Sequence, residues 1–384
     1  MNNNRIVSVG SLLLDIGIKC GETDSDLWNM LHGQKVEFNA PATYELIDEG
    51  KQVVVDFSQA KDQKIAGIGK RTFSLIGEIT TAAGGGASNA IIGIRKMTRN
   101  KPELSCQLIA KIGGKCGVPD EDGRALLAHL QNAGIETDLI LYNNAATGRS
   151  LVLSIEHNGK RDVIYLIYRG AAANLKAEEL HGLNMDGVYG GIVANTNSPE
   201  NTLNVIQWLS GNKRRVVYIS SKKDIEFMRN GNDEFFKGFE NVIMTVNEKE
   251  FSELGDDGLA KKQVIENFAH TIISRGTKGI NVYDGDLNFT HYDIAPDRPE
   301  FPADQINPNG AGDALSASLA AQYVLNNEFD KCTIELSLCV AACVCMRTST
   351  TSGVPVFKKA EDSAGFIRKW RGKDVFDLTE WEIS

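Results

Sequence analysis

The sequence has a deficit of positive charge and no long apolar segment. Its 41 Lys and Arg residues stand against 50 Asp and Glu, so that the formal net charge is −9. This balance argues against nucleic acid or an anionic membrane as a partner. No apolar run approaches the roughly 20 residues of a membrane-spanning helix, and the polar residues 1–5 lack the apolar core of a signal peptide. We therefore expect a cytoplasmic protein with no nucleic-acid and no membrane partner.

Cysteine pairs at metal-binding or redox spacing are absent, and so is a P-loop. Cys339, Cys343 and Cys345 form no Cys-x-x-Cys pair and lie in an apolar helical pattern over residues 334–346 without a nearby histidine. This placement favours buried thiols in a reducing compartment. No Gly-x-x-x-x-Gly-Lys-Ser/Thr sequence occurs, which excludes a P-loop nucleotide site.

The 384 residues, 42% of them apolar, suffice for one large domain with an appendage or for two domains. After residue 187, short apolar strands alternate with helical patterns, which is typical of a parallel sheet with helices on both faces. The predicted strands are residues 188–193, 216–220, 242–246, 271–273 and 280–283. No repeat, low-complexity tract or linker interrupts this half, so we expect no domain boundary in it.

The first half combines buried-strand patterns with segments typical of a small sheet. Residues 6–10 form an apolar strand pattern that ends at a glycine, and Asp15 follows shortly after it. Residues 34–80 contain short alternating segments with glycines and charges between them. Residues 150–156 and 162–168 are joined by an Asn-Gly pair, which predicts a β-hairpin.

One stretch near the C-terminal end carries the strongest chemical signal. Gly310, Ala311 and Gly312 directly precede Asp313, and an apolar helical stripe follows. Glycines ahead of a helix allow several backbone N–H groups to point at one anion, and the helix N-terminus adds partial positive charge. Asp313 is a carboxylate that can take a proton. The pattern predicts an anion site beside a base, as phosphoryl transfer to an alcohol requires; a merely capped helix is the alternative.

This stretch resembles the C-terminal signature of the ribokinase-like (PfkB-type) family of carbohydrate and nucleoside kinases. The resemblance implies that the amides of residues 310–312 bind the transferred phosphoryl group and that Asp313 deprotonates the acceptor hydroxyl. It also implies a ribokinase-like α/β fold, with a central mostly parallel sheet, helices on both faces and a small β-sheet lid. We expect a single domain over residues 1–384, with the lid formed by inserted segments at about 16–80 and 146–169.

Three further places match the substrate-binding residues of this family. Gly84 and Gly85 open a predicted helix that carries Asn89, which resembles the first family motif. Asp15 stands where the family has an aspartate that binds substrate hydroxyls, and Arg169 ends the predicted hairpin where sugar kinases contact the substrate. The plainer alternatives are an N-terminal helix residue for Asn89, a turn aspartate for Asp15 and a solvated arginine for Arg169. A dinucleotide-binding loop competes at the glycines, but its third glycine is absent and no convincing strand precedes it.

Two loops after the predicted strands match the nucleotide-binding residues of the family. Asn247 and Glu250 have its Asn-x-x-Glu spacing, so that the amide would face phosphate and Glu250 would hold Mg²⁺; an acidic helix start is the alternative. Ser274 and Gly276 resemble its ATP-phosphate loop. Residues 307–308 are Asn-Pro where the family usually has Asp-Thr, which puts activation by a monovalent cation in doubt.

The resemblance implies an enzyme that uses ATP and Mg²⁺ to phosphorylate a hydroxymethyl group of a small sugar or sugar acid. An adenosine-type nucleoside kinase is the alternative, and a non-catalytic nucleotide- or sugar-binding regulator is a rival from another class. The long lid insertion could cover the substrate or pair with a second subunit in a homodimer.

Overall fold

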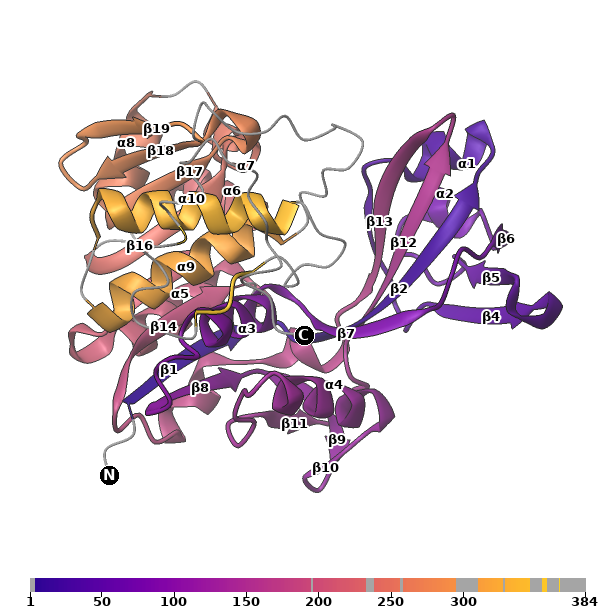
Figure 1. The fold of residues 1–384 in the computed structure, drawn as a ribbon, viewed down its shortest axis with the longest axis horizontal. Helices are drawn as coiled ribbons and strands as arrows, with labels where there is room; N and C mark the ends of the chain where they lie inside the picture. Colours follow the sequence, from indigo (N-terminus) through magenta and orange to yellow (C-terminus); the bar gives the residue numbers. More distant parts are fainter. Residues whose placement is uncertain are drawn as a thin grey trace.

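An eight-stranded sheet forms the centre of the protein in the computed structural model (Figure 1). The structure describes residues 4–194, 196–232, 238–255, 258–294, 310–326, 329–345, 354–357 and 366. The strand order is β19-β18-β17-β16-β15-β14-β1-β8. The strands from β17 to β8 run parallel, which confirms the mostly parallel sheet. Strand β18 is antiparallel, contrary to the prediction for residues 280–283, because the short turn at Gly276–Lys278 leads the chain directly back along β17.

Apolar side chains of the central sheet point to both faces, and each face is covered by helices. In β1, Ile6 belongs to one apolar cluster, whereas Val7 and Val9 belong to the other. The strands are β1 (Asn4–Gly10), β8 (Leu104–Ile109), β14 (Val188–Ala194), β15 (Arg215–Ile219), β16 (Phe239–Asn247), β17 (Phe268–Ser274), β18 (Ile280–Asp284) and β19 (Phe289–Tyr292). One face carries α3 (Gly86–Met97), α9 (Ala311–Asn326) and α10 (Lys331–Cys345). The other carries α5 (Pro199–Ser210), α6 (Lys222–Phe227), α7 (Glu248–Phe251) and α8 (Gly258–Glu266).

A five-stranded sheet, which we call the lid sheet, projects from the central body (Figure 1). Its order is β3-β13-β12-β2-β7. The strands are β2 (Leu13–Glu22), β3 (Lys35–Glu37), β7 (Thr80–Gly84), β12 (Arg149–His157) and β13 (Lys160–Tyr168). The predicted hairpin is confirmed: Asn158 and Gly159 both have positive φ, which a two-residue hairpin turn requires.

The two faces of the lid sheet differ in polarity. Side chains on one face, such as Ile16, Leu153 and Leu166, are buried in the apolar cluster that includes α1 (Ser25–Leu31). Because side chains alternate along a strand, Asp15 and its neighbours in register lie on the opposite face, which we call the open face. That face is only partly buried.

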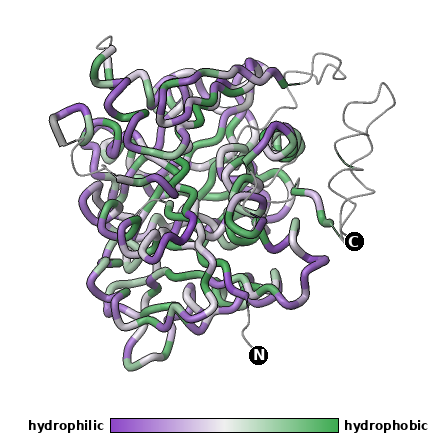
Figure 2. Tube along the Cα trace, turned by 90° about the vertical axis from the view of Figure 1, so that its left-hand side faces the viewer, coloured by the Kyte–Doolittle hydropathy of each residue, from purple (hydrophilic) through white to green (hydrophobic). Residues whose placement is uncertain are grey.

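Two smaller sheets and short helices complete the first half of the chain. Short segments within residues 34–80, predicted to belong to a small sheet, form β5 (Gln52–Asp56) and β6 (Lys70–Ser74), which pair with β4 (Thr43–Ile47). Strands β9 (Lys111–Lys115), β10 (Val118–Pro119) and β11 (Leu141–Asn143) form a further sheet. The remaining elements are α2 (Gln63–Ala66), α4 (Glu121–Asn132), the 3₁₀ turns Asp48–Gly50, Gly170–Asn174, Ala177–Gly182, Gly211–Lys213 and Ser252–Leu254, and a π-helical turn at Met228–Asn232. Figure 2 shows hydrophobic stretches running through the middle of the molecule.

The structure contradicts one alternative and one expectation about the strands near the site. Asp15 lies within β2 and not in a turn, because β12 and β7 pair on either side of it. A strand, β7, does precede the glycines of residues 84–86, although its exposed Thr and Ala residues give it no apolar strand pattern. Within the described residues, no helix is long and apolar enough to cross a membrane.

Candidate functional site

The packing of α3 against α9 joins Asn89 to Asp313. Asn89 lies in the first turn of α3 and Asp313 in the first turn of α9. The Nδ2 amide of Asn89 donates a hydrogen bond of 2.9 Å to Oδ2 of Asp313. The two residues are 224 positions apart in the sequence, so tertiary packing creates this pair.

The open face of the lid sheet adds Asp15 to this pair. A Cβ placed on Gly84 would lie 2.0 Å from Cγ of Asp15, so the carboxylate rests directly on the glycine backbone. Gly85 has a φ of +92°, and a Cβ there would lie 2.6 Å from the carbonyl oxygen of Ser11. A side chain at Gly84 would therefore displace the Asp15 carboxylate, whereas glycine is required at Gly85 by both its backbone conformation and the Ser11 backbone.

Burial makes the carboxyl groups of Asp15 and Asp313 weaker acids than that of an ordinary aspartate. It raises the pKa of Asp15 to about 7, and the negative charge of Asp313 adds to this effect. Burial also raises the pKa of Asp313 to about 6, although the hydrogen bond from Asn89 and the charge of Lys35 act in the opposite direction. A carboxylate with a pKa near 6 is ionised at neutral pH and takes a proton more readily than an ordinary aspartate.

The start of α9 leaves backbone amides available beside Asp313. Gly310 has a φ of +80°, and its carbonyl oxygen accepts the first helical hydrogen bond, from Ala314. The N–H groups of Ala311 and Gly312 precede that bond, so the helix itself does not satisfy them. A Cβ on Gly312 would meet none of the described residues within 4 Å, so they leave space beside this turn. Residues 307–308, on which the monovalent-cation expectation rests, lie outside the described residues.

The predicted nucleotide-binding residues meet at the ends of β16 and β17. Asn247 and Ser274 are partners in the parallel register of these strands. The Oδ1 atom of Asn247 accepts a 2.7 Å hydrogen bond from the N–H of Glu250 and so caps α7. Burial raises the pKa of Glu250. Gly276 has a φ of +58° with open space around it, as a loop that receives a ligand would need.

The structure pairs Arg169 with a residue that sequence analysis did not consider. Nε of Arg169 donates to Oε1 of Glu37 at 3.2 Å, and Lys61 also contacts this carboxylate, at 3.0 Å. These two cations and Lys223 lower the pKa of Glu37 to about 2, the hydrogen bond from Lys61 contributing most. Glu37 therefore already balances part of the charge of Arg169.

Two lid residues that the sequence did not single out, Tyr165 and Lys35, act electrostatically on the site. Burial raises the pKa of Tyr165, and the negative charges of Asp15 and Asp313 raise it further. The positive charge of Lys35 lowers the pKa of both Asp313 and Glu250. No local motif marks either position; only their alternation within short strands could have indicated the face on which they lie.

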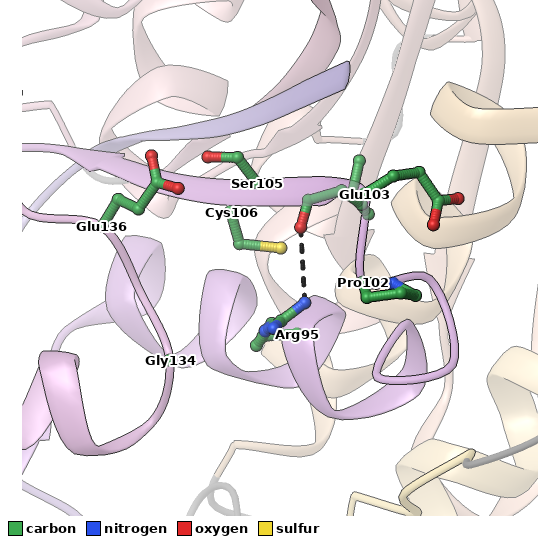
Figure 3. A pocket seen from close by; sticks show the side chains of 8 residues that line it. Arg95, Pro102, Glu103, Ser105, Cys106, Gly134 and Glu136 are labelled. Carbon is green, nitrogen blue, oxygen red and sulfur yellow. Dashed lines mark hydrogen bonds between the residues drawn. The ribbon is translucent and has the colours of Figure 1, made fainter. Parts of the chain in front are cut away.

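A separate cavity of about 150 Å³ lies at the start of β8 (Figure 3). Arg95, Glu103 and Glu136 line it, and Nη1 of Arg95 donates to the carbonyl of Leu104 at 3.3 Å. The candidate site lies at the opposite, carboxyl ends of the parallel strands, where ligands bind in open α/β sheets. Within the part of the chain that the structure describes, no three His, Cys, Asp or Glu residues gather to hold a metal ion. A role for Glu250 in binding Mg²⁺ would thus require water and phosphate ligands.

Comparison with known proteins gives one family and one fold. Residues 52–356 match the model of the pfkB family carbohydrate kinases. A nucleoside kinase of the ribokinase family from Methanocaldococcus jannaschii is 17% identical, with a TM-score of 0.62 over 95% of this chain and 98% of that one. The ribokinase from Thermotoga maritima is 16% identical, with a TM-score of 0.61 over 94% and 99%. A putative ribokinase II from Escherichia coli, solved with ATP and Mg²⁺, is 17% identical, with a TM-score of 0.59 over 95% and 99%. At these identities the structures show a shared fold, and no curated protein sequence matches the chain.

Proposed function

Because this chain belongs to the pfkB family of carbohydrate kinases, we propose that it transfers the γ-phosphoryl group of MgATP to a hydroxymethyl group of a small sugar. The observation that carries the proposal is the meeting of Asp15, Asn89 and Asp313 at one place. Two carboxylates and an amide can bind and orient the hydroxyl groups of a polyol. The start of α9, whose amides would bind the transferred phosphoryl group, lies beside Asp313.

The proposed mechanism assigns a different task to each group. Asp15 and Asn89 hold the acceptor, and Asp313 takes the proton of the hydroxyl group as its oxygen attacks phosphorus. The amides of Ala311 and Gly312, with Gly310 setting the turn, stabilise the negative charge that spreads over the transferred group. General-base action contributes about 10²–10⁴ in rate, and positioning and charge stabilisation contribute the larger remainder.

The nucleotide and metal belong at the ends of β16 and β17. Bound MgATP would supply the phosphoryl group there. Ser274 and Gly276 would contact its phosphates, and Glu250 would bind Mg²⁺ through water. Because the oxygen of Asn247 caps α7, the Nδ2 group of this side chain is the atom that would face phosphate.

The side chains of the lid sheet would determine which acceptor binds. Arg169 supports a sugar acid less than the sequence suggested, because Glu37 already pairs with it. A nucleoside is the second candidate, since the half-buried side chains of Val152, Tyr165 and Ile167 lie on the open face and could pack against a base. A non-catalytic regulator would have no need for a carboxylate with the raised pKa of Asp313.

The test is ATP consumption by the purified protein with ribose, fructose, sugar acids and nucleosides. Asp313→Asn should bind MgATP nearly as well as the native protein and lower turnover by orders of magnitude. Asp26→Asn is a matched control, because Asp26 also lies in a first helical turn but is exposed in α1. Undiminished turnover in Asp313→Asn would refute the base, and ATP binding without consumption for any acceptor would favour the regulator.

A lid-mediated homodimer and a cytoplasmic location stay predictions. The three-stranded sheet β4-β5-β6 has β4 at one edge, and Leu46 of that strand is 49% exposed. This edge is compatible with pairing to a second copy of the chain.

A further inference from the structure

Lys35 lies on the open face of the lid sheet, on the same face as Asp15. The register across the sheet pairs Gly17 with Val152, Val152 with Tyr165, and Tyr165 with Lys35. Its neighbour Val36 is only 5% exposed, so the alternation along β3 places Lys35 on the opposite side, facing away from the apolar cluster.

The side chain of Lys35 extends over Tyr165 toward the two carboxylates. Its Nζ atom lies 5.8 Å from the centre of the Tyr165 ring. Tyr165 in turn is close enough to Asp15 and Asp313 for their charges to raise its pKa. Lys35 is therefore directed along the row of residues that leads to the acceptor site.

The same strand also approaches the central body at the nucleotide side. Glu37 lies two residues after Lys35 and shares its face of β3. Its Oε1 atom is 3.8 Å from Nζ of Lys223, in the first turn of α6. Helices α6 and α7 follow the carboxyl ends of β15 and β16, and in Figure 1 the lid sheet stands opposite these ends. Strand β3 thus bridges the lid and the end of the sheet that carries Glu250.

In the part of the chain that the structure describes, no ion-pair partner explains the position of the Lys35 ammonium group. Among the described residues, no carboxylate lies within 4.0 Å of it, and the side chain is exposed. Its charge nevertheless lowers the pKa of Asp313. An exposed cation that lies over Tyr165 on the open face, on a strand that also reaches α6, is suited to an anion bound between the acceptor and nucleotide sites.

We propose that Lys35 is a phosphate-binding residue carried by the lid, which contacts the terminal phosphate of the bound nucleotide and the phosphoryl group during transfer. This inference rests on the proposed function. The mobile charge of a lysine side chain can follow the phosphoryl group from nucleotide to acceptor. Since the lid brings this charge, the phosphate site is complete only when the lid sheet covers it.

The first test compares MgATP with MgADP, because only ATP carries the terminal phosphate. Calorimetry on Lys35→Met should show ATP affinity lowered about 10-fold or more, as expected for a lost charge-assisted hydrogen bond, with ADP affinity unchanged. Lys19→Met is the matched control, since Lys19 is another exposed lysine on the open face, in register with Ser154. Equal losses for ATP and ADP, or none for either, would overturn the inference while the proposed function stands. If the native protein binds neither nucleotide, both fail.

The second test measures turnover with the acceptor found by the screen. Lys35→Met should lower kcat by about 10²–10³, the range for removal of one group that stabilises transition-state charge. Lys35→Arg should retain most of this activity, and added propylammonium should partly rescue Lys35→Ala. A structural role would not respond to a soluble amine, so the absence of rescue together with an inactive Lys35→Arg would contradict phosphate binding.

Discussion

Asp313→Asn should make the folded protein more stable at the pH at which it makes the enzyme inactive. Burial raises the pKa of Asp313 from 3.8 to about 6, so the folded state resists ionisation of this group. The amide oxygen of the substituted side chain can still accept the hydrogen bond from Asn89. The variant therefore removes a buried negative charge and keeps the contact.

The size of the effect follows from the pKa difference between the folded and unfolded states. Raising the pKa of Asp313 from 3.8 to about 6 on folding lowers the free energy of unfolding by about 3 kcal/mol above pH 7. Solvent still reaches the side chain, which is partly exposed, so the expected gain is about 1–2 kcal/mol. The pKa of Asp313 is higher in the folded state than in the unfolded state. Its contribution to the free energy of unfolding is therefore complete below about pH 4 and is lost as the pH rises through 6.

Urea denaturation of the native protein and the variant at pH 5, 6, 7 and 8 measures this difference. The advantage of Asp313→Asn should grow with pH and level off above pH 7. The charge of Asp313 raises the pKa of Asp15, so its removal also lowers that pKa. The double variant Asp15→Asn/Asp313→Asn should therefore gain less free energy of unfolding than the two single variants added together. A variant that is less stable at pH 8, or whose advantage does not change with pH, would refute a buried, charge-coupled pair.

Three further expectations concern activity. The profile of kcat/KM against pH should fall below about pH 6, tenfold per unit, because Asp313 must be ionised to accept a proton; a flat profile to pH 5 would speak against this base. Asn89→Leu removes the hydrogen bond that lowers the pKa of Asp313. The acidic limb of the kcat/KM profile should therefore shift by about one pH unit to higher pH, and an unchanged limb would show that this bond does not set the pKa. Gly84→Ala places a methyl group 2.0 Å from Cγ of Asp15. Because the carboxylate is displaced from the acceptor, the KM for the acceptor should rise about 10-fold or more while the KM for ATP stays unchanged. Initial-rate kinetics on both substrates measure the two values, and a raised KM for ATP with an unchanged KM for the acceptor would contradict this role.

Local structure around the motifs could be predicted because it depends on neighbours in the sequence. The Asn158–Gly159 turn sets the β12–β13 hairpin, because both residues adopt the positive φ that a two-residue turn requires. The family resemblance predicted the kind of fold, which the structure and the match over residues 52–356 confirm.

Contacts between distant segments could not be predicted in this way. Nothing near Arg169 in the sequence indicates that Glu37, on another strand, would neutralise part of its charge. Strand β3 has three residues, too few for a periodic pattern, so Lys35 carried no signal. The strand β7 was missed because its exposed residues give no alternation of apolar and polar side chains.

The sequence by itself determined the turn at residues 310–313, since a glycine-rich turn, a helix start and a carboxylate are fixed by adjacent positions. Only the tertiary structure decided their chemistry. The pKa values of Asp15 and Asp313 depend on burial and on each other's charge, and these arise when the lid sheet and two helices from opposite ends of the chain meet.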